Sequence, residues 1–91
     1  MNYREKAKKQ IDEIADKIDI LESKKESVNA EARAEYHRQL AEFKEIRQKL
    51  ESRLEKLSDS SEEKWKDAKD QFDEAADSIR LGFTKLTSMF K

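Results

Sequence analysis

The chain has 91 residues, of which 35% are hydrophobic and 45% are charged. Ordinary globular domains are roughly 45–50% apolar, so this supply excludes a wide core and favours long helices that pair along a narrow apolar seam. The formal net charge of −1 gives no overall attraction for nucleic acid. We therefore expect residues 1–91 to form a single helical coiled-coil domain with no nucleic-acid partner.

Two further properties bear on the class of protein. A disordered chain of this composition usually carries Pro and lacks periodicity, whereas this chain has no Pro, one Gly and a strong repeat. No stretch approaches the roughly 18–20 apolar residues of a membrane span, and the first ten residues lack the apolar run of a signal peptide. A cytoplasmic location is the default expectation, and the absence of Cys says nothing about it.

The first predicted helix covers residues 3–57. Its apolar residues follow the alternating four-three spacing of a heptad seam: Ala7, Ile11, Ile14, Ile18, Leu21, Val28, and later Leu50, Leu54 and Leu57. Between Val28 and Leu40 the spacing is four throughout, which shifts the heptad frame by one residue. Lys25 and Arg47 fall at seam positions, where a long charged side chain can fix register and partner number.

Whether this helix is continuous depends on residues 25–35. Residues 30–35 read Ala-Glu-Ala-Arg-Ala-Glu, which are strong helix formers, and no Gly or Pro interrupts the stretch. This favours one continuous helix over 3–57. The alternative is a break near 25–29, where Ser27 and Asn29 are suitable cap residues. Such a break predicts a monomeric three-helix bundle.

The second predicted helix covers residues 60–90. Ser58, Asp59, Ser60 and Ser61 indicate a turn, and Ser60 with Glu63 has the spacing of a capping box. Beyond the turn, two rows repeat every seven residues and a third widens the apolar stripe on one flank. The rows are Trp65, Phe72, Ile79 and Leu86; then Ala68, Ala75, Gly82 and Met89; then Ala76, Phe83 and Phe90.

The preferred arrangement is an unequal antiparallel hairpin. At 1.5 Å per residue the first helix would span about 80 Å and the second about 45 Å. The second helix would then leave the seam from Ile11 to Leu21 without a partner in its own chain. We therefore expect a homodimer with a four-helix centre, in which the small row admits close approach of a partner backbone.

The residue types that form catalytic and metal sites in other proteins show no such pattern in this sequence. His37 is the single histidine, and a zinc site needs three or four nitrogen or sulfur ligands. Ser58, Ser60 and Ser61 have no neighbouring His, and one Gly does not make a phosphate-binding loop. We expect no enzyme activity, no metal and no cofactor.

A second kind of function is open for the C-terminal segment. Residues 79–91 combine apolar residues with Arg80, Lys85 and Lys91, as an interfacial amphipathic helix does. Contact with a membrane surface is therefore the alternative to protein interaction.

Several segments together resemble a known family. They are the charged heptad helix, Ala-Glu-Ala-Arg-Ala-Glu-Tyr at 30–36, Leu-Glu-Lys-Leu at 54–57, a Ser-rich turn, and Glu-Lys-Trp-Lys-Asp-Ala at 63–68 followed by Phe72 and Ala75. The chain resembles the small bacterial stress-inducible coiled-coil proteins first catalogued in cyanobacteria. The resemblance implies a stress-linked cytoplasmic protein and supplies no catalytic residues.

The predicted function is a non-enzymatic structural or protein-interaction module that self-associates, with an unidentified protein as a further candidate partner. The predicted interaction seam consists of Ile11, Ile14, Ile18, Leu21, Leu50, Leu54, Leu57, Trp65, Phe72, Ile79, Phe83 and Leu86, with Lys25 and Arg47 setting the register.

Overall fold

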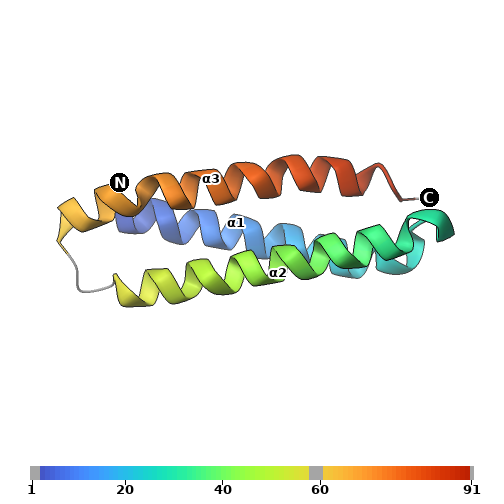
Figure 1. Ribbon diagram of the computed structural model, residues 1–91, viewed down its shortest axis with the longest axis horizontal. Coiled ribbons are helices and arrows are strands. Elements are labelled where there is room, and N and C mark those ends of the chain that lie inside the picture. The colour runs from blue at the N-terminus through green and yellow to red at the C-terminus, as the bar shows by residue number, and fades with distance from the viewer. Residues whose placement is uncertain (1–2, 58–60, 91) are drawn as a thin grey trace.

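The computed structural model describes residues 3–57 and 61–90, and it is all-α, as predicted. The elements in chain order are α1 (Tyr3–Ser23), the short 3₁₀ helices η1 (Lys25–Ser27) and η2 (Ala30–Ala32), α2 (Arg33–Lys56) and α3 (Glu62–Thr87). The three α-helices lie side by side in a rod that measures 48 × 19 × 17 Å (Figure 1).

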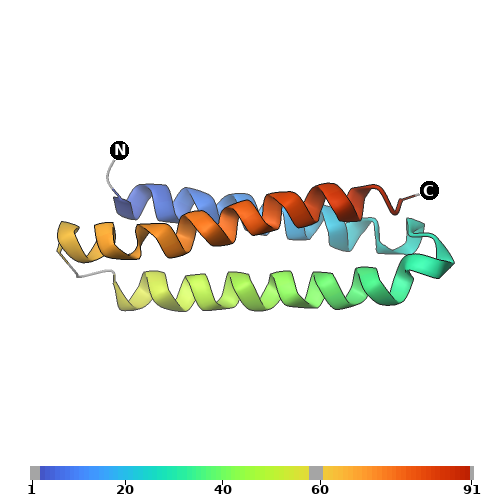
Figure 2. The ribbon, with the colours of Figure 1, turned by 45° about the horizontal axis from the view of Figure 1, so that its top comes forward.

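The helices run up, down and up along the rod. Figures 1 and 2 show α1 and α3 pointing the same way, with α2 antiparallel to both. The start of α1 therefore lies near the start of α3, and the end of α3 lies near the corner that joins α1 to α2. α1 packs extensively against both other helices, which contact each other much less.

The expectation of one continuous helix over residues 3–57 is wrong. α1 ends at Ser23 and α2 begins at Arg33, so the chain turns back through η1 and η2. The predicted alternative, a break near 25–29 and a three-helix bundle, is the arrangement found. The physical reason is tertiary: folding back lets α2 cover the apolar face of α1, and packing outweighs local helix propensity.

The predicted cap residues of the break do not act through their side chains. Asn29 precedes η2 and Ala32 precedes α2, and neither makes a side-chain cap hydrogen bond. At the other junction α3 begins at Glu62, where the Ser61 carbonyl accepts the Trp65 N–H at 3.2 Å. The proposed capping box of Ser60 and Glu63 lies outside the described residues, because it requires Ser60.

The core contains the first row of α3 in full and runs the length of the rod. Its completely buried side chains come from all three helices and the corner: Ile14, Leu21, Val28, Tyr36, Phe72, Ile79 and Leu86. The rings of Trp65 and Phe72 pack with their centroids 6.3 Å apart. Since the seam of each helix faces the other two, one chain buries its own apolar stripes.

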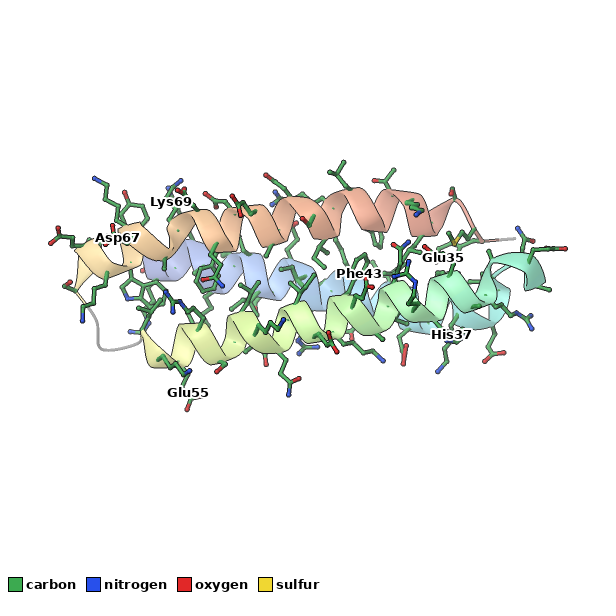
Figure 3. The ribbon with its side chains drawn as sticks, in the orientation of Figure 1. Glu35, His37, Phe43, Glu55, Asp67 and Lys69 are labelled. Atoms are coloured by element: carbon green, nitrogen blue, oxygen red, sulfur yellow. The ribbon has the colours of Figure 1, made fainter. Side chains whose placement is uncertain are left out.

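The small row of α3 admits α2, as a seam of small residues should. A Cβ added to Gly82 would lie 2.3 Å from Cζ of Phe43, which is closer than atoms can approach. Figure 3 shows Phe43 directed from α2 toward α3. The sequence predicted such close approach for a partner helix, and the partner is another helix of the same chain.

Candidate interaction surface

The predicted interaction seam forms the core of the bundle. Ten of its residues are buried: Ile11, Ile14, Ile18, Leu21, Leu50, Leu57, Trp65, Phe72, Ile79 and Leu86; Leu54 and Phe83 are partly buried against them. The seam from Ile11 to Leu21 was expected to lack a partner, which was the reason for predicting a homodimer. That seam is covered by α2 and α3, so the homodimer stays a prediction without this support.

The two predicted register residues lie at the edge of the core. The Lys25 side chain is 40% exposed, with Nζ 3.7 Å from the Glu22 carboxylate. The Arg47 side chain is 39% exposed and donates from Nε to Glu51 at 2.9 Å. Glu22 also accepts a 3.0 Å hydrogen bond from Lys44 of α2, which lowers the pKa of the Glu22 carboxyl. The effect of Lys25 and Arg47 on the helix register stays a prediction.

Polar contacts between α1 and α3 fix the relative position of these parallel helices. Arg80 donates two hydrogen bonds to the Glu13 carboxylate, of 2.7 Å from Nε and 3.0 Å from Nη2. These bonds lower the pKa of Glu13. One turn before Glu13 on α1, and two turns before Arg80 on α3, the Gln10 amide donates a hydrogen bond to the Asp73 carboxylate at 2.5 Å. This bond and the Lys69 ammonium lower the pKa of Asp73. Bidentate Arg–carboxylate pairs carry geometric specificity as well as energy.

A second group of charges lies where α2 faces the end of α3. Glu35 accepts hydrogen bonds from Arg38 at 2.7 Å and from Gln39 at 2.6 Å, and Nζ of Lys85 on α3 lies 3.6 Å away. The Arg38 guanidinium, followed by the Gln39 amide, lowers the pKa of Glu35 to about 2. Glu35 is labelled in Figure 3.

Few large apolar side chains reach the surface. In the described part of the chain the exposed ones are Leu81, at 75%, and Ile20, at 45%. Single exposed apolar residues are common on soluble proteins, so neither forms a patch. The other exposed side chains in the described ranges are charged or polar, apart from the small Ala30, Ala34 and Ala41.

One shallow depression lies between α1 and α3, near their N-terminal ends. It is lined by apolar Tyr3, Ala7, Trp65 and Phe72 and by polar Lys6, Gln10, Lys69 and Asp73. The polar side chains Gln10, Lys69 and Asp73 hydrogen-bond one another. Such mutual pairing fits a structural role and brings no nucleophile next to a general base.

Of the residues considered for chemistry, Ser58 and Ser60 lie outside the described residues. His37 is exposed on α2, with its ring edge-on to Tyr36 at 6.3 Å (Figure 3). Over residues 3–57 and 61–90 no three His, Cys, Asp or Glu side chains are grouped so that they would hold a metal ion. No helix in the same ranges is long and apolar enough to cross a membrane.

The segment considered for membrane contact is occupied in the bundle. Ile79 and Leu86 are fully buried, and Phe83, Met89 and Phe90 are partly buried against the core. Insertion of these side chains into lipid would require α3 to leave the bundle.

Comparisons of the chain with protein-family models, with curated proteins and with solved structures gave no match. The resemblance to stress-inducible coiled-coil proteins therefore stays a prediction from the sequence segments that carry it.

The contacts that sequence reasoning missed are those between distant helices. The Arg80–Glu13 pair joins residues 67 apart, and the Gln10–Asp73 bond joins residues 63 apart. Spacing within a helix identifies pairs four residues apart, such as Glu13 and Lys17, which lie 3.7 Å apart. It carries no information on which charges meet across helices.

Proposed function

We propose that the protein is a non-enzymatic helical module that acts by presenting its outer surface to a protein partner. The observation that carries this proposal is that ten predicted seam residues are buried in the chain's own core, while the other two, Leu54 and Phe83, pack against it. What is left for recognition is a convex, charged rod. A surface of this kind suits positioning and binding better than chemistry, which needs a concave site that excludes water.

The outer face of α3 around Leu81 is the favoured binding surface. Leu81 is the most exposed large apolar side chain among the residues described. Helical spacing places Asp77 and Lys85 one turn to either side of it. Protein interfaces have an apolar centre and a polar rim, and Leu81 would supply the apolar centre here. The partner should therefore offer a small apolar pocket bordered by charges of both signs.

Site-specific photocrosslinking tests this proposal. A photoreactive amino acid replaces Leu81 in one variant and Ser52, an exposed residue of α2, in a matched control. We expect a protein adduct in the native host that forms from position 81 and not from position 52. Leu81→Asp should abolish capture of the same protein, whereas Ser52→Asp should leave it unchanged. Equal adducts from both positions, or none, would argue against a partner on this face.

The same preparation tests the membrane alternative. With its apolar side chains in the core, the protein should stay at the bottom of a flotation gradient with anionic vesicles. Flotation that disappears when residues 79–91 are deleted would favour the membrane alternative. The cytoplasmic location stays a default expectation. The stress link rests on the family resemblance, and a comparison of protein abundance before and after stress tests it.

A further inference from the structure

The corner between α1 and α2 lacks the residues that normally stop a helix. Residues 24–32 contain no Gly and no Pro, and no described residue has a positive φ. Val28 and Asn29 adopt extended backbone conformations, with ψ values of 139° and 140°. Neither η2 nor α2 has a side-chain N-cap hydrogen bond. Nothing in the local sequence therefore requires the chain to turn here.

The corner is held instead by the residues that follow α3. The Asn29 N–H donates to the Met89 carbonyl at 3.1 Å, and Val28 and Phe90 pair as an isolated antiparallel bridge. The Phe90 ring also packs on the Tyr36 ring, with the centroids 6.0 Å apart. We call these contacts of Met89 and Phe90 the C-terminal clasp. The clasp joins the middle of the break and the first turn of α2 to a distant part of the chain.

Side chains of α2 replace the hydrogen bonds that a continuous helix would make. The Tyr36 hydroxyl donates to the Leu21 carbonyl at 2.5 Å, and Nε of Arg33 donates to the Val28 carbonyl at 3.3 Å. In a continuous helix each carbonyl would accept the backbone N–H four residues on. The bent corner thus exchanges local helical bonds for bonds that exist only while the bundle is closed.

The spacing of apolar residues also permits the straight alternative. Val28, Ala32, Tyr36 and Leu40 recur at intervals of four, so they follow a slowly rotating stripe along a continuous helix. Straightening the corner would join α1 and α2 into one helix of about 80 Å and lift α1 off its own bundle. The apolar face of α1 would then be exposed to water. The surface complementary to it is the one that α2 and α3 form in the closed bundle, so α2 and α3 of another chain could bury it.

We propose that two copies of the chain exchange α1 by straightening this corner. Each half of the dimer is then a bundle of α1 from one chain with α2 and α3 from the other. The two long helices run antiparallel and cross at residues 24–32. This inference goes beyond the proposed function, because the partner is a second copy and the surface is the core rather than the outer face of α3.

The exchange preserves almost every contact of the closed chain. The Arg80–Glu13 and Gln10–Asp73 bonds re-form between chains, together with the core outside the contacts of Val28 and Tyr36 at the corner. Only the C-terminal clasp and the bonds from Tyr36 and Arg33 are lost, and helical backbone bonds over 24–32 replace them. The equilibrium between the closed monomer and the exchanged dimer is therefore set by the free-energy difference at the corner and by the protein concentration, as in other domain exchanges between protomers.

Two variants shift this balance in opposite directions. Ala30 is exposed, begins η2 and follows an extended residue, which is a position that accepts proline. Ala30→Pro fits the bent corner and breaks a continuous helix, so the dimer association constant should fall by more than about a hundredfold. Ser27→Ala with Asn29→Ala favours the straight helix and should raise that constant by about tenfold or more.

The mass of each variant is measured by light scattering after unfolding and refolding at micromolar to millimolar concentration. The expected dimer has twice the 10.8 kDa mass of the chain. Ser52→Ala, which raises helix propensity in α2 away from the corner, is the matched control and should behave as wild type. Dimerisation of Ala30→Pro equal to wild type would overturn the proposal, as would a strict monomer for the double alanine variant.

A disulfide lock keeps the test decisive if Ala30→Pro fails to fold. The chain has no cysteine, so Asn29→Cys with Met89→Cys introduces a single pair across the antiparallel bridge. Opposed residues of such a bridge lie about 4.5–5.5 Å apart at Cα, within the range of a disulfide. The protein oxidised as monomer should not exchange, and reduction should restore exchange. Exchange at the same rate in both states would contradict the proposed opening.

Discussion

At the scale of single residues, Gly82 shows how a position with no side chain defines the packing of two helices. The Phe43 ring occupies the space where a Cβ of residue 82 would be, 2.3 Å from Cζ. Gly in a helix usually destabilises it relative to Ala, so its presence here has a packing reason. The Phe43–Gly82 contact lets α2 and α3 approach at one point although they touch little elsewhere.

Gly82→Ala is therefore expected to destabilise the protein despite its gain in helix propensity. Overpacking costs about 1–3 kcal/mol and the propensity gain offsets about 1 kcal/mol, so we expect a net loss of about 1 kcal/mol. Urea denaturation measures it. Phe43→Leu in the same chain relieves the clash, so the double variant should lose less than the sum of the two single variants. A Gly82→Ala variant more stable than wild type would show that Phe43 has room to move.

Glu35 links stability to pH. Its pKa is lowered from 4.5 to about 2, chiefly by the Arg38 hydrogen bond, so the folded state favours the ionised carboxylate. The resulting stabilisation is complete above the unfolded-state pKa and is lost as pH falls through the folded one. Glu13 and Asp73 shift in the same direction. The free energy of unfolding should therefore fall between about pH 4.5 and 2.

The Glu35→Gln variant measures how much Glu35 contributes to this dependence of stability on pH. The glutamine keeps the shape and loses the titration, so the variant should be less stable than wild type at neutral pH and converge with it at about pH 2. Thermal unfolding monitored by circular dichroism at several pH values measures both curves. Parallel curves across the whole range would show that Glu35 contributes nothing to the acid transition.

At the scale of elements, the sequence was sufficient for the helices and their apolar faces. The heptad rows of α3, its start after Ser61 and the all-α class follow from residues that act locally. The break between α1 and α2 does not. Residues 30–35 favour helix, and the turn forms because Phe90, Tyr36 and Arg33 make contacts there that no local pattern contains. Both arrangements were consistent with the spacing of apolar residues.

The candidate binding surface around Leu81 could not be predicted from the sequence; only the apolar residues that lie outside that surface could be. The predicted seam residues lie in or against the core. The sequence analysis assigned their partner to another chain, because a continuous first helix would leave Ile11 to Leu21 uncovered. Leu81 has no pattern that marks it, since its exposure depends on how α3 is rotated in the bundle. Cross-helix pairs such as Arg80–Glu13 depend on the same rotation.

At the scale of the whole molecule, one chain satisfies its own apolar stripes by folding back twice. The closed bundle and the proposed exchanged dimer share the core contacts between the helices and differ at residues 24–32 and in the contacts that Tyr36 and the C-terminal clasp make there. The closed form therefore presents only its charged rod to partners, whereas the open form is a long two-chain assembly. Concentration, and any condition that loosens the C-terminal clasp, should select between them.

The distance between residues 8 and 49 distinguishes these forms most directly. Spin labels at Lys8→Cys and Lys49→Cys, in labelled chains diluted with unlabelled ones, report only distances within one chain. In the closed bundle α1 and α2 are antiparallel neighbours inside a cross-section of 19 × 17 Å, so a single short distance is expected at low concentration. In the straight helix the same residues are about 60 Å apart at 1.5 Å per residue. A growing population at the long distance after refolding at high concentration is the result expected for exchange. A long distance at every concentration would contradict the closed three-helix bundle.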